Sequence, residues 1–197
     1  MDARALDALT ETDKVTTIYL IRHGQAESGW NMQRDPGLDD TGRRQAERAA
    51  RALAGRGPLP IIASPMRRAR ETAGEFEMLW QRPATLDPRI TEIPAPAALA
   101  PEERGAWLQA LAGRRWHELD PVIQDWRRAA IDCLLQVATD TVVVSHFMVV
   151  NAVVSWVADD ERVVVCRPQP GSCTTLERSG ATFRVAEAGA QGVSQVL

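Results

Sequence analysis

The stretch Ile18-Tyr19-Leu20-Ile21-Arg22-His23-Gly24 joins an apolar run directly to an arginine, a histidine and a glycine. A buried strand carries such a pair only at its carboxyl end, because an unpaired guanidinium is unstable in a core. Gly24 allows a sharp turn there, so that Arg22 and His23 point into the crevice beyond the strand. A guanidinium is a fork that suits phosphate, and a neutral imidazole is a nucleophile near neutral pH. The stretch therefore predicts phosphoryl chemistry at the end of a buried strand.

A second apolar run ends at Ser64 and Pro65. Serine is a good N-cap and proline a good first helical residue, so we predict a helix from Pro65 to Trp80. This helix would carry Arg67 and Arg68 in its first turn, where unpaired backbone amides already favour anions.

A third apolar run, Thr141-Val-Val-Val, leads to Ser145 and His146, and residues 147–156 follow as a mostly buried helix. In an open α/β sheet the strand ends gather on one side, and ligands bind there. We therefore expect the ends of the three runs to lie together around one phosphate group.

These motifs resemble those of the histidine phosphatase superfamily, and among its members the phosphoglycerate mutase branch most. The matching blocks, in order along the chain, are Arg22-His23-Gly24, Ser64-Pro65-Met66-Arg67-Arg68-Ala69, Arg89-Ile90-Thr91-Glu92 and Ser145-His146. The resemblance covers residues 15–185. It implies a mostly parallel central sheet with helices on both faces, and a small insert over the active site.

The resemblance assigns a role to each residue that faces the phosphate. His23 would be the nucleophile and would form a phosphohistidine intermediate that water later cleaves. Arg22, Arg68 and His146 would bind the phosphoryl oxygens and stabilise their developing charge. Phe147, which follows the second histidine, would present its backbone amide to the phosphate.

Glu92 would be the acid that protonates the leaving oxygen and then takes a proton from the attacking water. Glu27, close behind the first motif, is the alternative proton donor. The cationic side chains supply the electrostatics in such a scheme, so we expect neither a metal nor a cofactor.

The implied activity is that of a phosphoric monoester hydrolase of the histidine acid phosphatase type, acting on a phosphorylated small molecule. Two departures from the family pattern favour hydrolysis over a mutase reaction: Ile93-Pro94-Ala95-Pro96 after the glutamate, and Phe147-Met148 after the second histidine. The alternatives are a phosphotransferase like phosphoglycerate mutase, and a non-catalytic domain that binds a phosphorylated ligand.

Length and composition agree with one domain over residues 1–197, since 45% hydrophobic and 25% charged residues suffice for one sizeable core. The net charge of −3 gives no sign of nucleic-acid binding, and no apolar segment is long enough to span a bilayer. Residues 1–9 lack the apolar stretch of a signal peptide, so we expect a cytoplasmic protein. The sequence predicts no particular oligomeric state.

Strands alternate with helices along the chain, which predicts an α/β fold with a largely parallel sheet covered on both faces. The expected strands are residues 16–21, 59–63, 141–144, 162–166, 172–176 and 182–185. The segment 93–119 interrupts the alternation with three prolines and a short helix over 101–112. Trp107 and Trp116 within it either anchor this insert to the domain, which we favour, or form part of a substrate lid.

Overall fold

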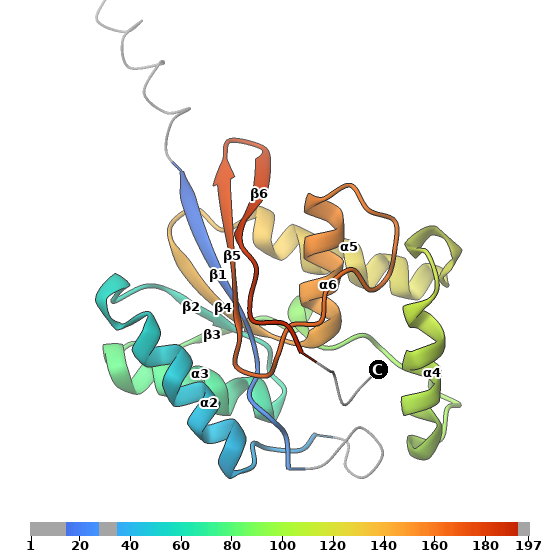
Figure 1. Cartoon of the computed structure of the whole chain (residues 1–197), viewed down its shortest axis with the longest axis horizontal. Coiled ribbons are helices and arrows are strands. Elements are labelled where there is room, and N and C mark those ends of the chain that lie inside the picture. The colour runs from blue at the N-terminus through green and yellow to red at the C-terminus, as the bar shows by residue number, and fades with distance from the viewer. Residues whose placement is uncertain (1–14, 28–34, 193–197) are drawn as a thin grey trace, which may run out of the picture.

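The computed structural model describes residues 15–27 and 35–192, so the opening residues, where we predict no signal peptide, lie outside the described part. A six-stranded sheet crosses the molecule in the order β3-β2-β4-β1-β5-β6 (Figure 1). Its strands are β1 (Thr16–Arg22), β2 (Ile61–Ala63), β3 (Thr85–Leu86), β4 (Thr141–Ser145), β5 (Cys173–Ser179) and β6 (Thr182–Glu187). The first four are parallel to one another, and β5 and β6 are antiparallel to their neighbours. The predicted α/β fold with a mostly parallel sheet is confirmed.

Helices cover both faces of this sheet. They are α2 (Asp40–Ala52), α3 (Arg67–Trp80), α4 (Arg104–Ala112), α5 (Pro121–Leu135) and α6 (Phe147–Val157), with single 3₁₀ turns η1 (Ala54–Arg56), η2 (Pro88–Ile90), η3 (Pro101–Glu103) and η4 (Trp116–Glu118). In Figure 1, α2 and α3 lie together on one side of the sheet, and α5 and α6 lie on the other. Among the described residues, no helix is both long enough and apolar enough to cross a bilayer.

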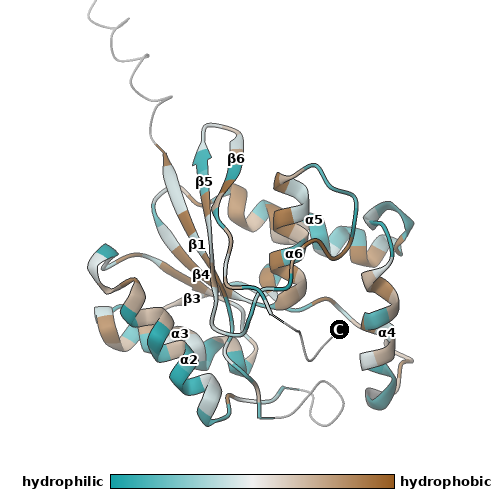
Figure 2. Cartoon of the chain, viewed as in Figure 1, coloured by the Kyte–Doolittle hydropathy of each residue, from teal (hydrophilic) through white to brown (hydrophobic). Residues whose placement is uncertain are grey.

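The central strands are apolar on both faces because each face packs against a helical layer. Ile18 and Leu20 of β1 belong to the core cluster shared with α5 and α6, whereas Tyr19 and Ile21 pack with α2 and α3. Figure 2 shows the hydrophobic colour concentrated along these strands. A strand buried on both sides reads as an unbroken apolar run, as the sequence has it here.

The strand predicted over 162–166 is wrong. Only an isolated bridge joins Arg162 to Arg115, and Val163, which is fully buried, donates its backbone N–H to the Arg114 carbonyl at 3.0 Å. The side-chain oxygen of Asn151, buried in α6, accepts hydrogen bonds from the backbone N–H groups of Val165 (2.8 Å) and Cys166 (3.0 Å). Because a side chain takes these donors, the segment follows α6 as a loop and the next strand begins later, at Cys173.

The insert over 93–119 is anchored by a tryptophan, as we favoured. Trp116 is buried, and its indole N–H donates to the Ser155 hydroxyl of α6 at 2.9 Å. Trp107 packs, partly buried, against the same core cluster. Arg114 forms an ion pair with Glu118 within the insert, at 2.9 Å. The position of the insert over the active site stays a prediction.

Candidate active site

The ends of three adjacent parallel strands place His23, Ser64 and His146 beside one another. The backbone N–H of His23 donates to the Ser145 carbonyl at 2.9 Å, and that of Ser64 donates to the Val144 carbonyl at 3.0 Å. The rings of His23 and His146 lie 5.1 Å apart between centroids, edge to face at 63°. Both rings are buried, so the strand ends bring the two imidazoles together inside the protein.

The hydrogen bonds of His23 define which ring nitrogen is free to react. Its Nδ1 lies 2.7 Å from the Gly24 carbonyl, which can only accept, so this nitrogen carries the proton. Nε2 is then the acceptor of the hydrogen bond from Arg68 Nε at 3.0 Å. Burial lowers the pKa of His23 well below its ordinary value, and the charges of Arg68 and Arg22 lower it further. The imidazole is therefore neutral, with a lone pair on Nε2.

Two buried arginines border this nitrogen. Arg68 lies in the first turn of α3, and burial lowers the pKa of its guanidinium, against the opposing charge of Glu92. Arg22 donates from Nη1 to the Pro168 carbonyl at 2.7 Å, and its guanidinium lies over the Phe147 ring at 5.1 Å. Its Nε is buried without a partner among the described residues, and burial lowers the pKa of Arg22 to about 10. Buried cations with spare donors are suited to binding an anion.

Ser64 is bonded to His146 and does not cap the following helix. The helix α3 begins at Arg67, with Met66 in the cap position and no side-chain cap, so the predicted start at Pro65 is wrong. The Ser64 oxygen accepts from the Met66 N–H at 3.3 Å and lies 2.8 Å from His146 Nε2. The hydroxyl proton has no other acceptor among the described residues, so we assign the hydroxyl as the donor to Nε2.

With this assignment, the proton of His146 lies on Nδ1. This nitrogen is buried and has no partner in the described part of the chain. Burial lowers the pKa of His146 well below its ordinary value, and the nearby charge of Arg68 adds to this effect. A neutral imidazole with an unused N–H donor is suited to a phosphoryl oxygen.

Glu92 is a buried carboxyl at the edge of the arginine pair. Its Oε1 accepts hydrogen bonds from the N–H groups of Ile93 at 3.0 Å and Met148 at 3.2 Å. Burial raises its pKa, although these hydrogen bonds and the charges of Arg68 and Arg22 oppose the shift. A raised pKa favours the protonated form, which a general acid requires. Glu27, in contrast, is partly exposed and lies 3.8 Å from Arg43, outside this group.

The sequence interpretation missed the contacts that hold the Arg22-His23-Gly24 turn in place. The Gly24 N–H donates to the Thr72 hydroxyl at 3.1 Å, and that hydroxyl donates to the Arg68 carbonyl at 2.8 Å. A Cβ on Gly24 would lie 2.4 Å from the Gly42 carbonyl oxygen, so the turn touches the first turn of α2. The glycine is thus required for close approach, a long-range reason that no local pattern contains.

The described part of the chain groups no set of metal ligands. Over residues 15–27 and 35–192, no three His, Cys, Asp or Glu side chains are grouped so that they could hold a metal ion. In the described chain, the unpaired hydrogen-bond donors at the site are the N–H groups of arginine and histidine side chains, and such groups bind anions rather than metal ions.

Comparison with known proteins agrees with this geometry. The sequence model of the histidine phosphatase superfamily (branch 1) matches residues 18–190. The chain belongs to this superfamily. A glucosyl-3-phosphoglycerate phosphatase of Mycolicibacterium vanbaalenii is 41% identical over 83 residues, which are 40% of this chain and 37% of that protein. Rv0525 of Mycobacterium tuberculosis is 31% identical over 132 residues, 63% of each chain. The matched regions thus span less than two thirds of these relatives.

Two of the solved structures that share the fold of this chain illustrate the likeness. A mycobacterial glucosyl-3-phosphoglycerate phosphatase superposes with a TM-score of 0.74 at 20% identity, covering 90% of this chain and all of that one. YhfR of Bacillus stearothermophilus has a TM-score of 0.74 at 23% identity, covering 92% of this chain and all of the other. In both cases the similarity extends over the whole α/β fold.

Proposed function

We propose that the protein is a phosphomonoesterase that hydrolyses a phosphorylated small molecule, without a metal, through a phosphohistidine on His23. One observation supports this more than any other. An unprotonated, buried imidazole nitrogen, His23 Nε2, lies 3.0 Å from the Nε of a buried arginine, Arg68. Cations beside the imidazole disfavour its protonated form, which keeps Nε2 free to react. A histidine with a purely structural function would not need such an environment.

In the first step, His23 Nε2 attacks phosphorus and the bond from phosphorus to the ester oxygen breaks. The arriving phosphoryl group displaces the Arg68 hydrogen bond from Nε2 and takes that N–H on its own oxygen. Arg22 and His146 Nδ1–H bind the other oxygens, where negative charge develops. Glu92 gives its proton to the leaving oxygen, which departs as an alcohol.

In the second step, the Glu92 carboxylate takes a proton from a water molecule, whose oxygen attacks phosphorus. The bond from phosphorus to Nε2 breaks, inorganic phosphate leaves, and His23 returns to its neutral form. Throughout, Nδ1–H stays bonded to the Gly24 carbonyl, which orients the ring and stabilises its positive charge in the intermediate. Glu92 is thus regenerated in its acid form.

Hydrolysis is preferred to phosphoryl transfer because relatives within the superfamily are named as phosphatases. The match lies in branch 1 of the superfamily, and the narrower histidine acid phosphatase type stays a prediction, as does a cytoplasmic location. Glucosyl-3-phosphoglycerate is one reasonable substrate to test, because it appears in the names of both the sequence relative and the structural one.

The test is hydrolysis of p-nitrophenyl phosphate in EDTA by the wild type and by His23→Ala. We expect turnover by the wild type and none above background in the variant. His117→Ala is the matched control, since His117 is an exposed histidine paired with Glu161. It should retain wild-type activity. Activity that survives in His23→Ala would refute the phosphohistidine route, and loss of wild-type activity in EDTA would refute metal independence.

A further inference from the structure

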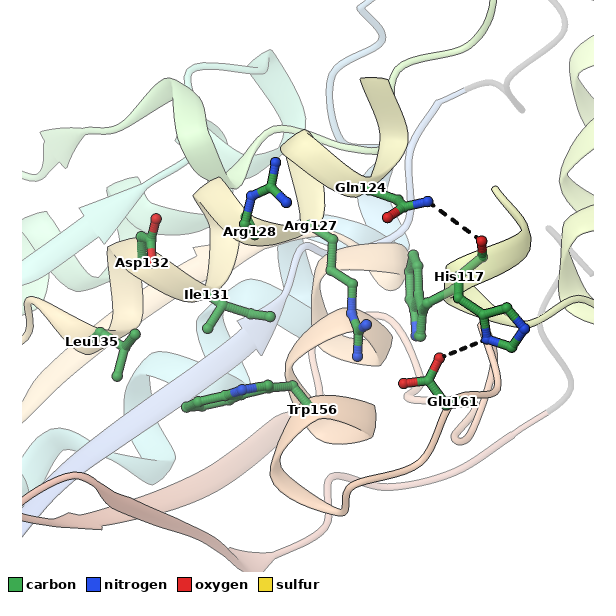
Figure 3. Close-up of a pocket in the computed structure, with 10 residues that line it drawn as sticks. His117, Gln124, Arg127, Arg128, Ile131, Asp132, Leu135, Trp156 and Glu161 are labelled. Atoms are coloured by element: carbon green, nitrogen blue, oxygen red, sulfur yellow. Dashed lines mark hydrogen bonds and ion pairs between the residues drawn. The ribbon is translucent and has the colours of Figure 1, made fainter. Parts of the chain in front are cut away.

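A cavity lies outside the proposed catalytic group, between α5, the turn η4 and the loop that follows α6 (Figure 3). Its volume is about 420 Å³, which is within the range of small-molecule sites. None of the residues that line it belongs to the proposed catalytic group, so its ligand would not be the phosphate ester bound at His23.

Arg127 brings to this cavity a positive charge that has no ion-pair partner among the described residues. Among the described residues, no carboxylate oxygen comes within 4 Å of its guanidinium, and its Nε is buried without a hydrogen-bond partner. Among the described residues, the Arg127 side chain makes one hydrogen bond, from Nη2 to the Ser155 hydroxyl, and it is long, at 3.5 Å. Burial accordingly lowers the pKa of Arg127. The nearby charge of Glu161 opposes this lowering, but without an ion-pair partner the partly buried guanidinium lacks the direct anion contact that would offset its desolvation.

Aromatic and aliphatic side chains surround this guanidinium. It lies over the Trp116 ring, 4.7 Å from the centroid, which fixes its plane. Figure 3 shows Ile131 and Arg127 both extending from α5 toward Trp156, with Leu135 farther along the same wall. Arg128 also lines the cavity, but it forms an ion pair with Asp125. An apolar wall beside one unpaired cation is suited to a ligand with a flat hydrocarbon body and one anionic group.

Two carboxylates at the cavity limit the charge of that ligand. Glu161 is bonded to His117 at 3.1 Å, and Asp132 lies exposed on α5. They would repel a multiply charged phosphate more strongly than a single carboxylate. We propose that this cavity binds a small aromatic monocarboxylate, with its carboxylate on Arg127 and its ring against Trp156. The planar guanidinium matches a carboxylate in shape and charge.

The test is a titration of the whole protein with 1-naphthoate, followed through the indole N–H signals of its tryptophans by NMR. We expect a saturable shift of the Trp116 and Trp156 signals with a dissociation constant in the millimolar range or below. 1-Naphthamide, which has the same shape without the charge, should bind at least about tenfold more weakly.

Arg127→Gln should weaken 1-naphthoate binding by about tenfold or more, while Arg127→Lys, which keeps the charge, should weaken it less. Arg44→Gln is the matched control, because it removes the same charge from an exposed position on α2. Thermal unfolding of each variant checks that it is folded, and the Lys variant covers the case in which the Gln variant is not.

Three results would overturn the proposal: no saturable shift of either indole signal, equal binding of naphthoate and naphthamide, or unchanged binding by a folded Arg127→Gln. Competition by naphthoate with p-nitrophenyl phosphate, with both indole signals unshifted, would also overturn it by placing the anion at His23. None of these outcomes depends on whether the protein hydrolyses phosphate esters, since binding is measured directly.

Discussion

The hydrogen bond between Ser64 and His146 yields a quantitative prediction for Ser64→Ala. With the hydroxyl present, the His146 proton lies on Nδ1, the nitrogen without a partner in the described chain. Removing the hydroxyl leaves the buried Nε2 without a partner in either tautomer, so nothing holds the proton on Nδ1, and a lone pair on Nδ1 can then face the phosphoryl group. The Nδ1–H tautomer loses the hydrogen bond that stabilised it, which is worth about 1–3 kcal/mol for a buried acceptor.

Because this cost applies where charge develops on the phosphoryl oxygens, it lowers kcat by about 5- to 150-fold and changes KM less. The assay is steady-state hydrolysis of p-nitrophenyl phosphate, with stability measured in parallel by urea unfolding. Ser155→Ala is the matched control: it also removes a buried serine hydroxyl with a hydrogen-bond partner, the Trp116 indole, but outside the site.

Both serine variants should lose stability to a similar extent, and only Ser64→Ala should lose kcat. Equal kcat in the wild type and Ser64→Ala would refute the tautomer argument. A kcat loss of the same size in Ser155→Ala would show that loosened packing, and not the tautomer, limits the rate.

We further expect measurable effects of substitutions at the proposed acid Glu92, at Gly42, whose helix touches the turn after β1, and at the proposed phosphate-binding Arg22. The pKa of Glu92 is raised, and kcat should fall as the pH rises through that pKa, since the ionised carboxylate has no proton to give. Glu92→Gln should lower kcat for an alkyl phosphate by about 10²–10⁴-fold. The loss should be smaller for p-nitrophenyl phosphate, whose leaving group needs no proton, and equal losses for the two substrates would contradict the role of Glu92 as acid. Gly42→Ala should destabilise the fold by about 1–3 kcal/mol in urea unfolding, because the new Cβ would lie 2.1 Å from the Gln25 carbonyl oxygen. Gly74→Ala, in open space within α3, should instead stabilise the fold by about 0.5–1 kcal/mol. A change of the same sign in the free energy of unfolding of both variants would be inconsistent with the close contact at Gly42. Arg22→Lys should lower kcat/KM for p-nitrophenyl phosphate by about 100-fold. An unchanged kcat/KM would show that the Arg22 guanidinium does not bind the phosphoryl group.

The sheet and the grouping of the two histidines could be predicted because their signals are local. Each histidine directly follows an apolar run, and neighbouring parallel strands bring their carboxyl ends to one edge. Arg68 is likewise local, since it lies in the first turn of the helix after the second run. In each case a few consecutive residues contain both the strand and the group that it positions.

The contacts that could not be predicted join residues far apart in the chain. Ser64 has the local features of a helix cap, yet its hydroxyl bonds a histidine 82 positions later. The 162–166 segment has the composition of a strand, but Asn151 holds its backbone against α6. In both cases a tertiary hydrogen bond outweighs the local preference, because a buried donor or acceptor must find a partner wherever the fold supplies one.

The central claim is that phosphate passes through a covalent bond to His23. The most direct measurement mixes the protein with excess p-nitrophenyl phosphate, quenches in alkali, where phosphohistidine survives, and locates the added phosphoryl group by peptide mass spectrometry. We expect one phosphoryl group on the peptide that contains His23, at the wild-type level in His117→Ala and missing in His23→Ala. Turnover without any such adduct, or an adduct on His146 instead, would contradict it.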